Sequence, residues 1–105
     1  MSRSPRKGEE DRKWRSAARA SPRVPGVARR LGARIRQLRK AGGMNQEAAA
    51  DAANLSPKHW QDLEGGRSNP TLSSLVAIAE ALNVSLSDLF AGVFEPPERD
   101  GPSDG

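Results

Sequence analysis

The chain has 105 residues, enough for one small domain, and it contains no cysteine, which excludes disulfides and thiolate metal sites. No apolar run is long enough to span a membrane and no signal-peptide pattern follows the basic N-terminus, so we expect a cytoplasmic protein with no membrane partner. The net charge of +4 is unevenly distributed: residues 1–30 carry ten Lys and Arg against three acids, residues 31–90 carry six of each, and residues 91–105 carry one against four. This pattern suits a polyanionic partner.

The two ends of the chain have the composition of disordered segments. Residues 1–26 have few apolar side chains and no helical periodicity, so they bury too little surface to offset the entropy of ordering. We expect a disordered basic arm there and a short disordered acidic tail at residues 93–105, with the folded domain at residues 27–92. Two interpretations of the arm remain open. It is a cationic arm that follows nucleic-acid phosphates or enters a minor groove, or it is a solubilising tail or upstream sequence added by a wrongly chosen start codon.

The first predicted helix covers residues 27–41. Apolar residues recur at three- and four-residue spacing, which gives one apolar stripe, and Gly42 and Gly43 end the helix. The helix is also basic, with Arg34, Arg36, Arg39 and Lys40.

Two short helices follow, joined by a tight turn. Asn45 can cap an alanine-rich helix at residues 46–53, and Ser56 with Pro57 can begin a second helix that ends at Gly65. Asn54 tolerates a positive φ at the bend. So short a link requires a steep crossing, where small alanines of the first helix leave space that Trp60 can fill.

The second of these helices has two chemically different faces. At about 100° per residue, Trp60 and Leu63 lie on one side, while Lys58 and Asp62 lie on the other. The polar face offers donors and acceptors of the kind that read base edges in a major groove. The alternative interpretation is an ordinary solvated face.

The C-terminal part of the domain is predicted to be apolar and helical. Thr71 caps a helix at residues 71–82 with a wide apolar face, and Ser85 or Ser87 begins a last short helix that ends at Phe90. These residues either complete the core of a small all-α bundle or also form a dimer interface. The dimer-interface candidates are Leu89, Phe90, Val93 and Phe94.

Residues 31–90 resemble the phage-repressor and Cro-like helix-turn-helix family, also called the XRE family. The resemblance lies in LGARIRQLRKAGGMNQ, the alanine-rich helix, NLSPKHWQDLEGGRSNP and TLSSLVAIAEALNVSLSDLF. It implies a compact all-α bundle of five helices with a helix-turn-helix, a lambda-repressor-like DNA-binding domain. It also implies a partly buried ion pair between Arg39 and Glu64, and phosphate contacts from the loop at residues 66–70 and from Gln46.

The expected DNA contacts combine the resemblance with the chemistry of the side chains. The residues expected to read bases are Ser56, Pro57, Lys58, Gln61 and Asp62. The residues expected to contact phosphates are Arg34, Asn45, Gln46, His59, Arg67, Ser68 and Asn69.

The sequence therefore predicts a sequence-specific, double-stranded DNA-binding transcriptional regulator, a repressor or operon controller that acts as a homodimer on an inverted-repeat operator in the bacterial nucleoid. Two alternatives remain: the antitoxin of a toxin–antitoxin pair, or an adaptor that binds another protein and no longer binds DNA. No enzyme, cofactor or metal is expected, because His59 is the only histidine and no nucleophile has a base available.

Overall fold

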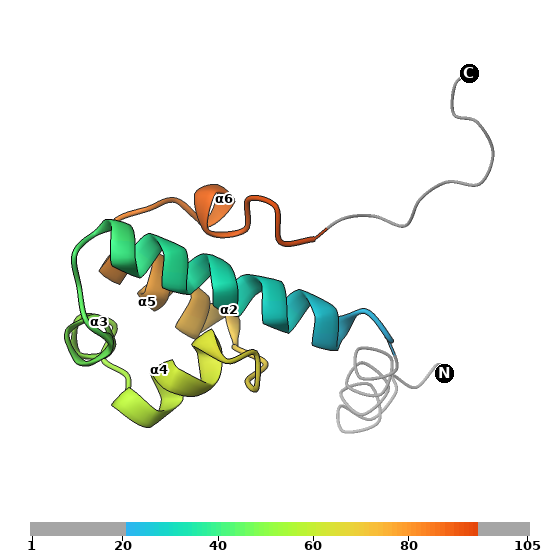
Figure 1. The fold of residues 1–105 in the computed structure, drawn as a ribbon, viewed down its shortest axis with the longest axis horizontal. Helices are drawn as coiled ribbons and strands as arrows, with labels where there is room; N and C mark the ends of the chain where they lie inside the picture. The colour runs from blue at the N-terminus through green and yellow to red at the C-terminus, as the bar shows by residue number, and fades with distance from the viewer. Residues whose placement is uncertain (1–20, 95–105) are drawn as a thin grey trace, which may run out of the picture.

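The computed structural model describes residues 21–94, which fold into helices joined by short turns. The helices are α2 (Val24–Ala41), α3 (Gln46–Ala52), α4 (Pro57–Glu64), α5 (Leu72–Leu82) and α6 (Leu86–Leu89). The longest, α2, crosses the domain, with α4 on one side of it, α6 on the other and α5 behind (Figure 1). Within residues 21–94, the predicted all-α bundle of five helices is confirmed. The predictions for residues 1–20 and 95–105 lie outside the described residues.

Four of these helices begin at a polar residue whose side chain accepts a backbone hydrogen bond. Asn45 Oδ1 accepts from the Ala48 N–H at 2.7 Å, and Ser56 Oγ accepts from the His59 N–H at 3.1 Å. Such caps satisfy N–H groups that have no partner inside the helix. The helix starts are therefore encoded locally, by the residues Asn45, Ser56, Thr71 and Ser85.

The domain extends past both of its predicted limits. Helix α2 begins at Val24, three residues before the predicted start, because Pro25 lies in the first turn, where its missing N–H is not needed. At the other end Val93, which the sequence placed in the acidic tail, is only 1% exposed and belongs to the hydrophobic core. The assignment of Val93 to the tail was wrong. None of the helices in residues 21–94 is long and apolar enough to cross a membrane.

The crossing of α3 and α4 is packed as large against small. Trp60 of α4 is fully buried in the same cluster as Ala49, Ala50 and Ala53. The turn between the helices passes through Asn54 at φ 59°, the left-handed conformation that asparagine tolerates. The tryptophan thus holds the two helices together while the opposite face of α4 stays exposed to solvent.

Gly32 of α2 allows α4 to approach closely. A Cβ atom at this position would overlap the Leu63 carbonyl oxygen and lie 2.5 Å from the Glu64 carbonyl oxygen. Both neighbours are backbone atoms at the end of α4, so they yield only if the helix moves. The absence of a side chain at Gly32 therefore sets the distance between α2 and α4.

We expect Gly32→Ala to lower the free energy of unfolding by roughly 1–3 kcal/mol, because the added methyl group overpacks this contact. Urea denaturation followed by circular dichroism measures the effect. Gly26→Ala is the matched control in the same helix, since its Cβ would be 3.6 Å from the nearest atom, the end of the Arg30 side chain. The control should be neutral or stabilising by up to about 1 kcal/mol. Equal stability of the Gly32 variant and the wild type would contradict the close contact.

Candidate nucleic-acid interface

The Glu64 carboxylate, at the C-terminal end of α4, connects three helices. Arg39 of α2 donates to it from Nε at 2.5 Å and from Nη2 at 3.1 Å. Gln46 of α3 donates from Nε2 at 2.9 Å, and Trp60 donates from Nε1 at 2.6 Å. The Glu64 side chain is only 4% exposed. Charge-assisted hydrogen bonds of this kind are strong and directional, so they hold α4 in one orientation on α2 and α3.

Only part of this network was expected from the sequence. The ion pair of Arg39 and Glu64 was implied by the family resemblance, but the donations from Gln46 and Trp60 were missed. The spacing of four residues places Trp60 and Glu64 on the same face of α4, so it was a signal for the tryptophan contact. Arg39 also donates from Nη1 to the Met44 carbonyl oxygen at 2.9 Å, which ties the turn before α3 to the same cluster.

The surroundings of Glu64 lower its pKa. Burial alone would raise the pKa of this carboxyl group, but hydrogen bonds from Arg39, Gln46 and Trp60, together with the positive charge of Arg39, outweigh burial and hold the pKa below its ordinary value. The ionised form is therefore the one that stabilises the fold. That contribution is complete above the ordinary pKa of a glutamate, about 4.3, and is lost as the pH falls through the lowered pKa of the folded state.

We expect the free energy of unfolding of the wild type to fall more steeply below about pH 5 than that of Glu64→Gln, whose side chain does not titrate. Every other carboxylate is the same in the two proteins, so the difference between their pH profiles isolates Glu64. Urea denaturation at several pH values between about 3 and 7 measures it. Parallel profiles for the two proteins would show that Glu64 has the same pKa in the folded and unfolded states.

The outer face of α4 is open to solvent. Ser56, Pro57 and Gln61 are exposed, and the Lys58 side chain is 83% exposed. Asp62 is less exposed, because its carboxylate lies 3.7 Å from Lys58 Nζ and 3.3 Å from Arg67 Nε. Exposed ion pairs of this type contribute little free energy and exchange readily for other partners. The five residues expected to read bases therefore lie together on one accessible surface.

Two of the seven side chains expected to contact phosphates have hydrogen-bond partners within the domain. Arg34 donates from Nε and Nη2 to the Asp88 carbonyl oxygen of α6, at 3.0 and 2.8 Å. It is about 200° around α2 from Gly32, which faces α4, so it points to the opposite side of the domain. The Gln46 amide is directed to Glu64. Arg34 therefore lies away from the other expected contacts, whereas Gln46 lies beside Asn45 with its amide engaged. That either side chain contacts a phosphate stays a prediction.

The remaining five residues lie around the two ends of α4. Asn45 is exposed and His59 is partly exposed. Arg67, whose side chain is 63% exposed, donates to Asp62 Oδ1 and to the Gln61 carbonyl oxygen, each at 3.3 Å. These contacts hold the guanidinium group beside the end of α4.

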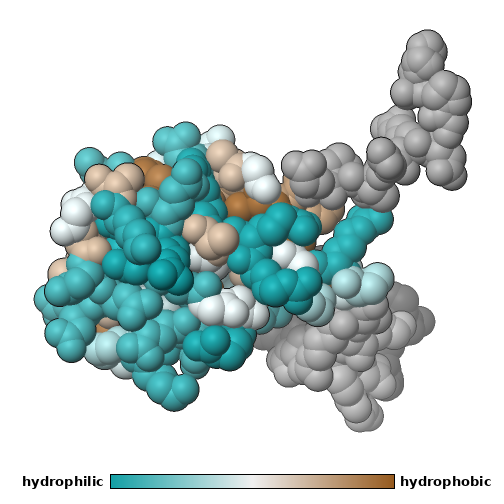
Figure 2. Space-filling view, in the orientation of Figure 1, coloured by the Kyte–Doolittle hydropathy of each residue, from teal (hydrophilic) through white to brown (hydrophobic). Residues whose placement is uncertain are grey.

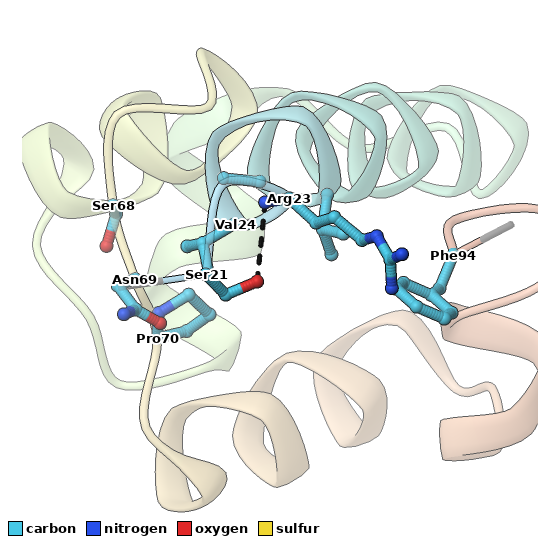
Figure 3. Close-up of a pocket in the computed structure, with 9 residues that line it drawn as sticks. Ser21, Arg23, Val24, Ser68, Asn69, Pro70 and Phe94 are labelled. Carbon is cyan, nitrogen blue, oxygen red and sulfur yellow. Dashed lines mark hydrogen bonds between the residues drawn. The ribbon is translucent and has the colours of Figure 1, made fainter. Parts of the chain in front are cut away.

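Ser68 and Asn69 lie where the loop after α4 meets the start of α2. With Pro70 they line a pocket of about 310 Å³ whose other residues come from the segment just before α2, from its first turns and from Phe94. Figure 3 shows the Arg23 side chain extending toward Phe94 and away from Ser68 and Asn69. The Arg23 side chain therefore does not cover Ser68 and Asn69.

The dimer-interface candidates divide between the core and the surface. Leu89 and Val93 are 0% and 1% exposed and belong to the core of their own domain, so they were wrongly predicted as interface residues. Phe90 is partly buried, whereas Phe94 is 52% exposed. The large apolar residues that do reach the surface of residues 21–94 are Leu72, Val76, Leu86 and Phe94.

Two short helices that cross over a buried tryptophan, the second of them with an open polar face, define a helix-turn-helix protein. The family model described as "Helix-turn-helix domain" matches residues 30–90, and the chain belongs to this family. Its relatives confirm the Cro-like type predicted from the sequence.

Three relatives show the range of the family. The chain is 38% identical over 60 residues to the HTH-type transcriptional regulator DdrOP3 of Deinococcus deserti, covering 57% of this chain and 46% of that protein. It is 42% identical over 57 residues to the immunity repressor protein of Bacillus phage phi105, covering 54% and 40%. It therefore spans less than half the length of these two proteins. Among solved structures, the restriction-modification controller protein C.AhdI of Aeromonas hydrophila superposes with a TM-score of 0.59 at 32% identity, covering 60% of this chain and 96% of that one.

Proposed function

We propose that the protein is a sequence-specific DNA-binding transcriptional regulator that acts in the cytoplasm and inserts α4 into the major groove. The observation that carries this proposal is the outer face of α4, where Lys58 and Gln61 are exposed while Trp60 and Leu63 on the opposite face are buried. An α-helix fits the major groove, and polar side chains on its outer face reach base edges. The names of the relatives, which are a transcriptional regulator, a repressor and a controller protein, support the same function.

Each exposed residue of α4 has a chemically suitable partner on DNA. Lys58 donates to guanine O6 and N7, Gln61 pairs with adenine N6 and N7, and Asp62 accepts from cytosine N4. Ser56 retains a hydroxyl donor after capping the helix, and Pro57 offers only apolar contact, which suits a thymine methyl group. Asp62 exchanges its ion pairs with Lys58 and Arg67 for the base when the helix enters the groove.

The residues around the ends of α4 are proposed to contact phosphates and to set the register of the helix. Arg67 supplies a positive charge, and further hydrogen-bond donors come from Ser68, Asn69, Asn45 and His59. Such contacts contribute affinity without reading the sequence. The Gln46 side chain contributes indirectly, by holding Glu64 and so the end of α4.

We propose that the regulator is a homodimer that binds an inverted repeat with half-sites about one helical turn, or roughly 10 bp, apart. The surface apolar residues Leu72, Val76 and Leu86 of α5 and α6 are available to a second copy, and Leu72 is 69% exposed. Sedimentation velocity over a range of concentrations tests this. A sample that stays monomeric both alone and on its selected duplex would refute the dimer.

The experiment that tests the proposed function is the selection of bound duplexes from a random pool, followed by footprinting at two salt concentrations. A recovered inverted repeat, with protection in the major groove, supports the proposal. Failure to enrich any sequence, or binding that does not weaken with salt, would favour an adaptor that binds protein instead, because neutralised phosphates must release counterions.

We expect Lys58→Ala to weaken binding to the selected duplex by about 1–3 kcal/mol, which is roughly 6- to 150-fold, and to weaken binding to a scrambled duplex much less. The reason is that a base contact is lost only at the correct base. Fluorescence anisotropy with both duplexes measures the two affinities. Lys58→Arg is the control, because arginine also pairs with guanine and should retain most of the affinity. Equal losses on both duplexes would make Lys58 a phosphate contact.

A further inference from the structure

Helix α2 carries six basic residues and no acidic one, and three of the six already have partners. Arg39 binds Glu64, and Arg34 donates to the Asp88 carbonyl oxygen. Arg30 donates from Nε to the Val93 carbonyl oxygen at 2.7 Å. Arg30 and Arg34 therefore hold α6 and the turn after it on the far side of α2. The basic residues not engaged in this way are Arg29, Arg36 and Lys40.

These three residues form one line along the outside of α2, which we call the α2 basic stripe. Their spacings of seven and four residues place them within about 40° of one another on the helix, and the stripe is about 16 Å long. All three are exposed. Within residues 21–94 no ion pair or side-chain hydrogen bond engages them. Three like charges in a row repel one another, so the stripe is suited to an anionic partner.

The stripe begins beside the loop that follows α4. A Cβ atom on Gly66 would be 2.8 Å from the Arg29 Cα, so the loop lies directly against α2 at this residue. The stripe then runs about 40–80° around α2 from Gly32, which touches the end of α4. It therefore flanks α4 and continues the surface that starts at Arg67. The face of the domain seen in Figure 2 is mostly hydrophilic.

We propose that the α2 basic stripe binds the phosphate backbone of DNA that flanks the groove occupied by α4. This inference rests on the proposed function and adds a second contact surface to it. One strand of a duplex carries a negative charge about every 3.4 Å along the axis, so a line of cations about 16 Å long faces several phosphates. Because the stripe holds only Arg and Lys, it adds affinity and salt dependence without sequence preference.

The test compares the full-length wild type with the variant Arg29→Gln/Arg36→Gln/Lys40→Gln on the selected duplex and on a scrambled one. Affinity is measured at several salt concentrations, and hydroxyl-radical footprinting maps the protected backbone. We expect the slope of log affinity against log salt to become shallower by about 2–3 units, because each phosphate contact contributes about 0.9. We also expect equal losses on both duplexes and loss of protection only outside the central site. Circular dichroism melting verifies that the variant is folded.

A second variant, Arg29→Lys/Arg36→Lys, keeps the positive charges and should keep the wild-type salt slope, since a phosphate contact needs only the charge. An unchanged slope in the glutamine variant would overturn the proposal. Tighter binding by the glutamine variant would also overturn it, because the stripe would then be occupied by an anionic segment such as residues 95–105, with four acids and one arginine. If the wild type binds no duplex, the proposed function itself fails. If the wild type binds DNA and the glutamine variant binds with the same affinity and salt slope, only the proposed role of the stripe fails.

Discussion

Glu64→Ala is expected to lower the free energy of unfolding by about 3–5 kcal/mol, because it leaves the Arg39 charge buried without its partner. Arg39 is only 8% exposed, so water cannot replace the lost carboxylate. The substitution also removes the acceptor for Trp60 Nε1 and Gln46 Nε2, and unpaired buried donors are costly. A small domain has little stability to spare, so this variant should unfold at a much lower urea concentration than the wild type.

Two further variants distinguish the loss of the Glu64 hydrogen bonds from the general effect of removing a carboxylate. Glu80→Ala removes an exposed glutamate of α5 and should change stability by less than about 0.5 kcal/mol. Arg39→Met combined with Glu64→Ala should recover part of the loss, because no uncompensated charge remains. If Glu64→Ala proved as mild as the Glu80 control, the three hydrogen bonds from Arg39 and Gln46 would not hold α4 to the domain.

Trp60→Ala is expected to cost about 3–5 kcal/mol of unfolding free energy, as large-to-small substitutions of buried aromatic residues do. Trp60 is 0% exposed and packs in the same cluster as Ala49, Ala50 and Ala53, which are too small to close the resulting cavity. The same change removes a hydrogen bond to Glu64. Urea denaturation measured by circular dichroism gives the size of the effect.

Trp60→Phe distinguishes the packing role of the tryptophan from its hydrogen bond. Phenylalanine keeps most of the side-chain volume but cannot donate a hydrogen bond to Glu64. We therefore expect Trp60→Phe to lower the free energy of unfolding much less than Trp60→Ala does. An alanine variant with the same urea midpoint as the wild type would show that Trp60 is not what joins α3 to α4. Because Trp60 and Glu64 contact each other, their effects should not add in the double variant.

Both substitutions leave every proposed DNA-contacting side chain in place. We therefore expect any loss of DNA affinity to reflect a displaced α4 rather than a lost contact. The pairing of a buried anchor on one face of a helix with an open polar face on the other explains why eight residues suffice for this element. Helix α4 is too short to be stable in isolation, so its packing on the domain and the hydrogen bonds to Glu64 position it.

The sequence by itself determined the features that depend on a few neighbouring residues. Helix starts were readable from Asn45, Ser56 and Thr71 because a cap bonds an N–H only two or three residues away. The two faces of α4 were readable because helical geometry fixes which residues share a side. The bend at Asn54 followed from its tolerance of a positive φ.

Only the tertiary structure decided which partner each side chain meets. Leu89 and Val93 are apolar residues of the kind found in dimer interfaces, but they lie in the core of their own domain. Arg34 donates to the Asp88 carbonyl oxygen and does not point toward the end of α4. Gln46 turns inward to Glu64, and Gly32 matters because a carbonyl from α4 lies against it. In each case the partner is distant in sequence, and burial depends on how whole helices pack, which local periodicity does not specify.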